Sequence, residues 1–133
     1  MENEARVAIR SAADIVTARL KGRALATELG FDGSDLTLIA TAISEITRNI
    51  VTHAKSGEIL LTRLDQNGKH GILIVASDQG PGIPDVNRAM QYGYSTVKGL
   101  GVGLPGAKWL MDEFEIESKI GNGTKVTMKK WLK

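Results

Sequence analysis

The residues best suited to chemistry lie in one helical segment and in two glycine-rich turns. In the segment 36–53, Glu45 and Asn49 are four residues apart and therefore share one face of a helix. A carboxylate can take a proton and an amide oxygen can ligate Mg²⁺, so this pair suits acid–base chemistry beside a hard cation or a water. The structural alternative is that Glu45 forms a surface ion pair with Arg48 at i, i+3.

Asp78 begins the first glycine-rich turn, DQGPG, which follows an apolar run. An aspartate at the end of such a strand can accept a hydrogen bond from a ligand amine, or it can bond the backbone of its own turn. Both interpretations stand on the residues alone. Gly80 and Gly82 would let a ligand approach the bare backbone, and they also suit an ordinary turn.

The second turn, GLGVG, lies just before an expected helix. Amide N–H groups at the start of a helix have no intrahelical partner and attract an anion, so this turn predicts a site for a phosphorylated ligand. It is not a P-loop, because no Gly-Lys-Ser/Thr follows, and it is a poor dinucleotide fingerprint, because no strand precedes it. The polar segment 92–98 before it predicts a mobile lid, in which Lys98 is either the cation nearest to a terminal phosphate or a solvated lysine.

The hydrophobic pattern predicts the elements that position these residues. Helices are expected over 14–29, 36–53 and 104–112, and strands over 5–10, 58–64, 72–77, 114–119 and 124–131. Asp14 is expected to cap the first helix, and Ser34 or Asp35 the second. Asn67 and Gly68 predict a hairpin between the second and third strands. The expected fold is an α+β two-layer sandwich, with a mixed, mostly antiparallel sheet and three main helices on one face.

Length and composition restrict the class of protein. A chain of 133 residues suggests a single domain over 1–133, and 42% hydrophobic with 24% charged residues is ordinary for a globular protein. The absence of cysteine excludes disulfides, thiolate metal sites and a cysteine nucleophile. No apolar leader is visible and no run reaches the roughly 18 residues of a membrane span, so a cytoplasmic location is expected. A net charge of +2 and 5% aromatic residues argue against nucleic-acid binding.

The order of the motifs resembles the GHKL family, the ATP-binding fold shared by histidine kinases, DNA gyrase, the heat-shock chaperones and MutL. Glu-x-x-x-Asn on a helix is followed by Asp-x-Gly-x-Gly after a strand, by a lid and Gly-x-Gly-x-Gly, and by Gly123-Thr124 at the last strand. The resemblance covers residues 35–133. The segments ISEITRN, DQGPGIPD, GYST, GLGVGLPGAK and LMDEFEIESKIGNGT are most similar to the serine/threonine kinases of the anti-sigma-factor branch.

This resemblance implies a role for each matching residue. Glu45 would be the general base that takes the proton from a serine or threonine hydroxyl, and Asn49 would ligate the Mg²⁺ that bridges the phosphates of ATP. Asp78 would bind the amino group of adenine, and Thr124 would support adenine through a water. The other implied nucleotide-binding residues are Gly80, Gly82, Lys98, Gly99, Gly101, Val102, Gly103 and Leu104.

The resemblance also implies partners. The substrates would be STAS-domain antagonist and scaffold proteins of the RsbS and RsbR type, in a stressosome. Once released, the kinase would activate a PPM-type phosphatase of the RsbU type. One alternative is an anti-sigma factor kinase of the SpoIIAB or RsbW type, which binds a sigma factor directly. Another is a detached histidine-kinase ATPase domain, whose partner would carry a phosphoacceptor histidine. No nucleic-acid or membrane partner is expected.

Overall fold

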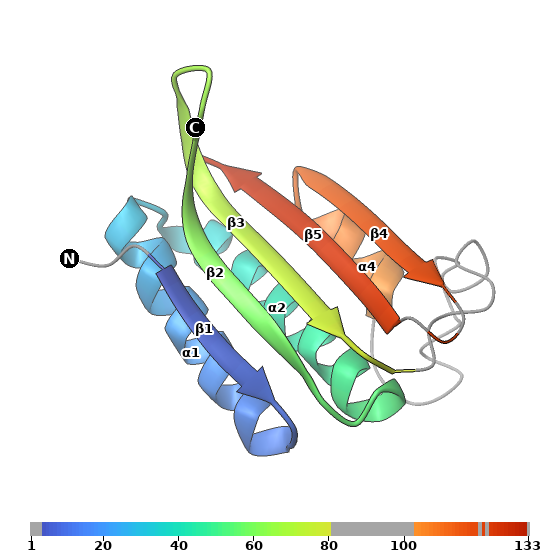
Figure 1. The fold of residues 1–133 in the computed structure, drawn as a ribbon. Helices are drawn as coiled ribbons and strands as arrows, with labels where there is room; N and C mark the ends of the chain where they lie inside the picture. Colours follow the sequence, from blue (N-terminus) through green and yellow to red (C-terminus); the bar gives the residue numbers. More distant parts are fainter. Residues whose placement is uncertain (1–3, 81–102, 120, 122, 133) are drawn as a thin grey trace.

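The computed structural model describes residues 4–80, 103–119, 121 and 123–132, which form a five-stranded sheet with helices on one face (Figure 1). The strands are β1 (Glu4–Ile9), β2 (Gly57–Gln66), β3 (Lys69–Asp78), β4 (Glu113–Lys119) and β5 (Gly123–Trp131), in the sheet order β1-β2-β3-β5-β4. The helices are α1 (Ala12–Leu29), α2 (Gly33–His53) and α4 (Gly103–Leu110). Every pairing between these described strands is antiparallel, and the predicted α+β sandwich is confirmed.

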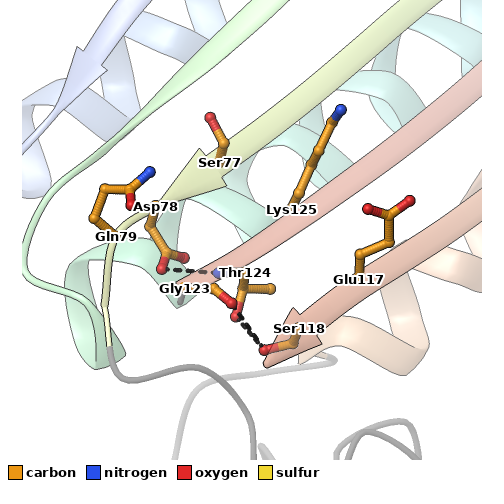
Figure 2. A pocket seen from close by; sticks show the side chains of 8 residues that line it. All are labelled: Ser77, Asp78, Gln79, Glu117, Ser118, Gly123, Thr124 and Lys125. Atoms are coloured by element: carbon orange, nitrogen blue, oxygen red, sulfur yellow. Dashed lines mark hydrogen bonds between the residues drawn. The ribbon is translucent and has the colours of Figure 1, made fainter. Parts of the chain in front are cut away.

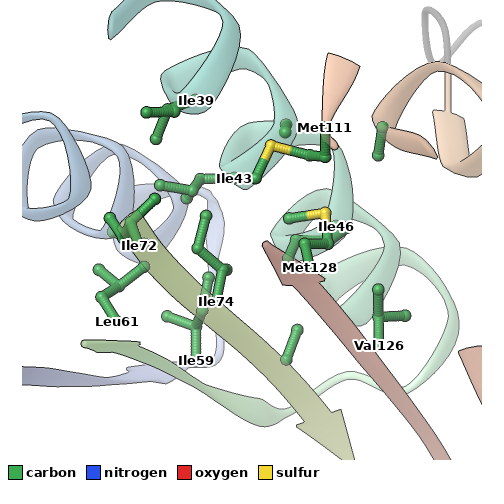
Figure 3. Packing of buried hydrophobic residues seen from close by; sticks show 14 of the residues in the cluster. Ile39, Ile43, Ile46, Ile59, Leu61, Ile72, Ile74, Met111, Val126 and Met128 are labelled. Atoms are coloured by element: carbon green, nitrogen blue, oxygen red, sulfur yellow. The ribbon is translucent and has the colours of Figure 1, made fainter. Parts of the chain in front are cut away.

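The core lies between the sheet and the helices (Figure 3). Alternate residues of the strands point toward the helices, as expected for a sheet with one buried face. The fully buried core side chains include Ile39, Ile43, Ile46, Ile59, Leu61, Ile72, Ile74 and Met128. Helices α1 and α2 approach closely at Gly22, where an added Cβ would lie 2.2 Å from Cδ1 of Ile43. The small residue in α1 therefore allows this contact.

The predicted caps of both long helices are wrong. Helix α1 is capped by Ser11, and Asp14 lies in its first turn, where its carboxylate accepts the backbone N–H groups of Arg10 at 2.8 Å and Ser11 at 3.2 Å. Helix α2 is capped by Asp32, so the predicted caps Ser34 and Asp35 lie inside its first turn.

Within the described chain, no helix combines the length and the apolar character needed to cross a membrane.

The hairpin between β2 and β3 forms at the predicted position. Asn67 and Gly68 have φ angles of 54° and 80°, the positive values that a tight two-residue hairpin turn requires. The paired register runs from Gln66 opposite Lys69 to Gly57 opposite Asp78. Asp78 therefore lies at the end of β3 that is far from the hairpin turn at Asn67 and Gly68.

Candidate functional site

Asp78, the last residue of β3, is the best-defined polar group of the site. Asp78 is buried, with only 8% of its surface exposed. Oδ1 accepts the backbone N–H of Gly80 at 2.9 Å and that of Thr124 at 3.3 Å. Among the described residues, Oδ2 accepts no hydrogen bond. Asp78 therefore bonds the backbone of its own turn and of β5, and it also lines the cavity described below.

Gly123 lets β5 start directly against Asp78. Its φ angle is 82°, and a Cβ added there would lie 2.0 Å from the carbonyl oxygen of Asp78. A side chain at this position would displace either the end of β3 or the start of β5. The glycine before Thr124 is therefore required for packing, whatever ligand the site takes.

Thr124 is buried beside Asp78, and its hydroxyl contacts a residue that the sequence analysis missed. Oγ1 of Thr124 lies 2.8 Å from Oγ of Ser118 on β4, and Ser118 also donates to the carbonyl oxygen of Gly123 at 3.2 Å. The register places Ser118 directly opposite Thr124 and Thr124 directly opposite Asp78. These three residues thus form one cross-strand row on the helix side of the sheet. The strand alternation could have placed Ser118 on that side, but not beside Thr124.

A cavity of about 280 Å³ lies at this end of the sheet (Figure 2). It is lined by Ser77, Asp78, Gln79, Glu117, Ser118, Gly123, Thr124 and Lys125. Besides the row of Asp78, Thr124 and Ser118, the register forms a second row of Ser77, Lys125 and Glu117 on the other face of the sheet. Asp78 and Thr124, for which the resemblance implies roles toward adenine, are thus neighbours, and the second row was not foreseen.

Glu45 and Asn49 lie on α2, with Glu45 buried and Asn49 half-buried. Glu45 is 8% exposed, and its Oε1 lies 3.1 Å from Nη1 of Arg48. The i, i+3 ion pair that the sequence allows is therefore present, but it is not a surface pair, because its carboxylate is buried. Neither Glu45 nor Asn49 lines the cavity beside Asp78.

Two glycines bring α2 close to the turn that follows β3. A Cβ on Gly57 would lie 2.9 Å from Cγ2 of Ile50 on α2 and 3.0 Å from Cβ of Asp78. A Cβ on Gly80 would lie 2.6 Å from Cβ of Ala54, the residue at the C-terminal end of α2. The C-terminal part of the helix that carries Glu45 and Asn49 is therefore packed directly on the Asp78 turn.

The remaining predicted residues belong to the second glycine turn and its surroundings. Gly82, Lys98, Gly99, Gly101 and Val102 lie outside the described residues, as does the predicted lid. Gly103 and Leu104 are the first two residues of α4, which begins one residue earlier than expected. The helix start that the phosphate prediction requires is therefore present.

With this fold and site, the class of protein follows from comparison with known families. Residues 10–130 match the histidine kinase-like ATPase domain, and the chain belongs to that family. The predicted GHKL resemblance is thereby confirmed.

Individual relatives narrow the comparison. The chain is 49% identical to the serine/threonine-protein kinase RsbT of Bacillus subtilis over 133 residues, which is the full length of both proteins. It is 36% identical to an anti-sigma F factor of Caldanaerobacter subterraneus over 121 residues, 86% of this chain and 83% of the relative. It is 34% identical to an anti-sigma F factor of a Thermoanaerobacter species over the same shares of both chains. These matches confirm the predicted branch, its particular resemblance to RsbT, and the enzyme class of protein serine/threonine kinases.

Proposed function

We propose that the chain is an ATP-dependent kinase that phosphorylates a serine or threonine on STAS-domain antagonist and scaffold proteins of the RsbS and RsbR type. When released from them, it would activate a PPM-type phosphatase of the RsbU type in the regulation of a stress sigma factor. The full-length similarity to RsbT supports this choice of partners. Residues 1–133 would act as one ATP-binding domain in the cytoplasm.

The observation that carries the proposal is the arrangement of Asp78. Its carboxylate is buried, two backbone N–H groups hold Oδ1, and Oδ2 has no hydrogen bond from the described residues. A carboxylate held in one orientation by two backbone N–H groups suits an N–H donor of a ligand, because its oxygens only accept hydrogen bonds. We assign it the amino group of adenine, with Thr124 beside it. Gly80 and Gly82 would lie against the base.

The phosphates would be held at the other glycine turn and at α2. Gly103 and Leu104 start α4, whose first amide groups and helix dipole favour an anion. The other residues proposed for this part are Lys98, Gly99, Gly101 and Val102. Asn49 would supply an amide oxygen to Mg²⁺, a cation that commonly takes few protein ligands and completes its shell with phosphates and water. When bound, Mg²⁺ would neutralise charge on the phosphates.

Glu45 would act as the general base toward the substrate hydroxyl. It lies one helical turn from Asn49, so a proton acceptor and a proposed metal ligand share one face of α2. Phosphoryl transfer needs positioning and charge neutralisation more than covalent chemistry. A rigid helix packed on the Asp78 turn provides such positioning.

A second candidate function is an anti-sigma factor that binds a sigma factor directly, and the 36% identity to an anti-sigma F factor supports it. Immobilised protein can be incubated with a sigma factor or with a STAS-domain protein. Retention of the STAS protein alone supports the kinase proposal, and retention of the sigma factor supports the alternative.

The decisive experiment is incubation with radiolabelled ATP, Mg²⁺ and a candidate STAS-domain protein, followed by mapping of the phosphorylated residue. An acid-stable phosphoserine or phosphothreonine is expected. An acid-labile phosphate would instead point to a histidine-kinase ATPase domain. Asp78→Asn is expected to abolish ATP binding, and retained binding would contradict the adenine assignment.

A further inference from the structure

We propose that Lys130 is a positioning residue for the phosphates of the nucleotide, because it fixes the C-terminal end of α4 and thereby keeps the N-terminal end of that helix in place to bind an anion. This inference rests on the proposed function, in which the start of α4 at Gly103 and Leu104 faces the phosphates of ATP. Lys130 lies at the opposite end of α4, so it acts through the helix and needs no contact with the ligand.

Helix α4 is too short to be stable by itself. It has 8 residues (Gly103–Leu110), which form about two turns and span about 12 Å. Isolated helices shorter than about 12 residues are marginal in water, so contacts with the rest of the protein must determine whether these two turns form. The first N–H groups and the last carbonyl groups of any helix also lack intrahelical partners. The groups that bind the two ends of α4 therefore decide how well it is formed.

Lys130 supplies a cation to the C-terminal end of this helix. It lies on β5 and is only 5% exposed. Its Nζ donates to the carbonyl oxygen of Leu110, the last residue of α4, at 3.5 Å. A cation at this end of a helix also interacts favourably with the helix dipole. Nζ lies 3.8 Å from Oδ1 of Asp112 and 4.0 Å from Oδ1 of Asp35, so the buried charge is balanced by two carboxylates.

The residues that follow α4 are held to the same strand. The backbone N–H of Asp112 donates to the carbonyl oxygen of Lys129 at 3.0 Å, and Oδ2 of Asp112 accepts the backbone N–H of Trp131 at 2.8 Å. Met111, between the helix and Asp112, is buried in the core (Figure 3). The C-terminal end of α4 is thus joined to β5, and through Asp35 it is also joined to the first turn of α2.

The two ends of α4 are coupled because the helix is so short. Phosphates bound at its start would stabilise the first turn, and Lys130 stabilises the last turn. Without this cation, α4 would be well formed in a smaller fraction of molecules, and the affinity for the phosphates would fall by that fraction. Adenosine carries the same base as ATP but no phosphate, so its binding does not depend on the start of α4.

The test is the ratio of the dissociation constants of adenosine and ATP, measured by calorimetry on the full chain. Wild type is expected to bind ATP more tightly than adenosine. Lys130→Met should reduce this ratio about fivefold, the equivalent of about 1 kcal/mol of phosphate binding. Lys130→Arg keeps a cation and should retain most of the ratio. Lys129→Met changes the adjacent residue, which lies on the other face of the sheet, and should leave the ratio unchanged.

A merely structural role of Lys130 would leave the ratio unchanged, because a less stable fold weakens adenosine and ATP alike. An unchanged ratio in folded Lys130→Met would therefore overturn the inference. Hydrogen exchange of wild type gives a second measurement that does not require any variant to fold. Saturating ATP should slow amide exchange over residues 106–110 more than saturating adenosine does, and equal protection by the two ligands would contradict the coupling between the ends of α4.

The two proposals fail in different ways. If wild type binds ATP more tightly than adenosine and Asp78→Asn abolishes binding, but the ratio does not respond to Lys130→Met, only the role of Lys130 is wrong. If the wild-type chain binds no ATP, the kinase proposal is wrong, and the role of Lys130 falls with it.

Discussion

Nη1 of Arg48 lies 3.1 Å from Oε1 of Glu45, one turn earlier on α2. The carboxylate that we propose as the general base is thus buried and paired with a cation whose side chain is 37% exposed. This pair links two properties that can be separated by mutation. The charge of Glu45 serves the proposed chemistry, whereas the contact with Arg48 contributes to the stability of the helix and its surroundings.

Glu45→Gln tests the chemistry. Glutamine keeps the shape of the side chain but cannot take the substrate proton. Phosphoryl transfer is expected to fall by about 10²- to 10⁴-fold, the usual contribution of a general base. ATP affinity should stay near the wild-type value, because the base is not assigned to nucleotide binding. Transfer is measured with radiolabelled ATP and affinity by calorimetry. Transfer at the wild-type rate would mean that another group is the base.

Arg48→Met tests the stability of the pair. Methionine keeps an apolar stem but removes one charged partner of a buried carboxylate, so the free energy of unfolding should fall by about 1–2 kcal/mol, less than for a fully buried pair. Urea unfolding measures this change. When Glu45→Gln is added, the combined loss should be smaller than the sum of the single losses, since both changes remove the same interaction.

A surface ion pair provides the control for Arg48. Arg6→Met removes the contact between Arg6 and Glu58, whose side chains are 59% and 48% exposed. It should cost less than about 0.5 kcal/mol, because exposed pairs contribute little. If Arg6→Met and Arg48→Met lowered the free energy of unfolding equally, the expectation that burial of Glu45 strengthens its ion pair would be contradicted.

The sequence predicts the fold well because hydrophobic periodicity depends on neighbouring residues. The alternation in β4 and β5 and the apolar face of α2 follow from local spacing. The caps are not predicted correctly, since several good capping residues stand close together near each helix start. Asp32, Ser34 and Asp35 are all suitable for α2, and the structure begins the helix after Asp32, next to the buried Phe31.

The site is predicted less completely because its contacts join distant strands. Thr124 donates to Asp78 across 46 positions of sequence. That contact depends on β5 lying beside β3, a sheet order that local patterns do not determine. Ser118 is an ordinary polar residue of an edge strand until the register places it opposite Thr124. Motif resemblance identified Asp78 and Thr124, but it did not identify Ser118, whose hydroxyl contacts that of Thr124.

Lys130→Met tests a buried cation away from the proposed site. Lys130 is 5% exposed, and its Nζ lies 3.5 Å from the carbonyl oxygen of Leu110, 3.8 Å from Oδ1 of Asp112 and 4.0 Å from Oδ1 of Asp35. It thus joins β5 to the C-terminal end of α4 and the start of α2. Its loss should lower the free energy of unfolding by about 1–2 kcal/mol, because both aspartates are partly exposed and can be rehydrated.

The neighbouring lysine is the matched control for Lys130. Lys129 points to the other face of the sheet, and its Nζ lies 3.9 Å from Oε1 of Glu113. Lys129→Met should change the free energy of unfolding by less than about 0.5 kcal/mol. If Lys130→Met and Lys129→Met unfolded at the same urea concentration, the anchoring role of Lys130 would be contradicted.

The β2–β3 hairpin should contribute a pH-dependent term to stability through Asp65. Hydrogen bonding to His70, and secondarily the contact with Arg63, lowers the pKa of the Asp65 carboxyl below its ordinary value of 3.8. A lowered pKa in the folded state means that stabilisation is present above 3.8 and is lost as the pH falls through the folded-state pKa.

Asp65→Asn should therefore have a lower melting temperature than wild type at pH 6, and the two curves should converge toward pH 2. The difference should also shrink in about 1 M salt, because the Asp65 side chain is 51% exposed and its charge is readily screened. Thermal unfolding followed by circular dichroism across this range measures both effects. A difference that is constant with pH would contradict the assignment.

Alanine substitutions at Gly121 and Gly123 can distinguish the effect of backbone strain from the effect of the close contact with Asp78. Gly121 and Gly123 have φ angles of 84° and 82°, but an added Cβ meets nothing within 4 Å at Gly121 and lies 2.0 Å from the carbonyl oxygen of Asp78 at Gly123. Gly121→Ala should cost about 1 kcal/mol of stability through strain alone and leave ATP affinity unchanged. Gly123→Ala should cost more and weaken ATP binding by at least about tenfold, because Asp78 must move. Calorimetry and urea unfolding measure both, and equal ATP affinities would show that Asp78 does not depend on the start of β5.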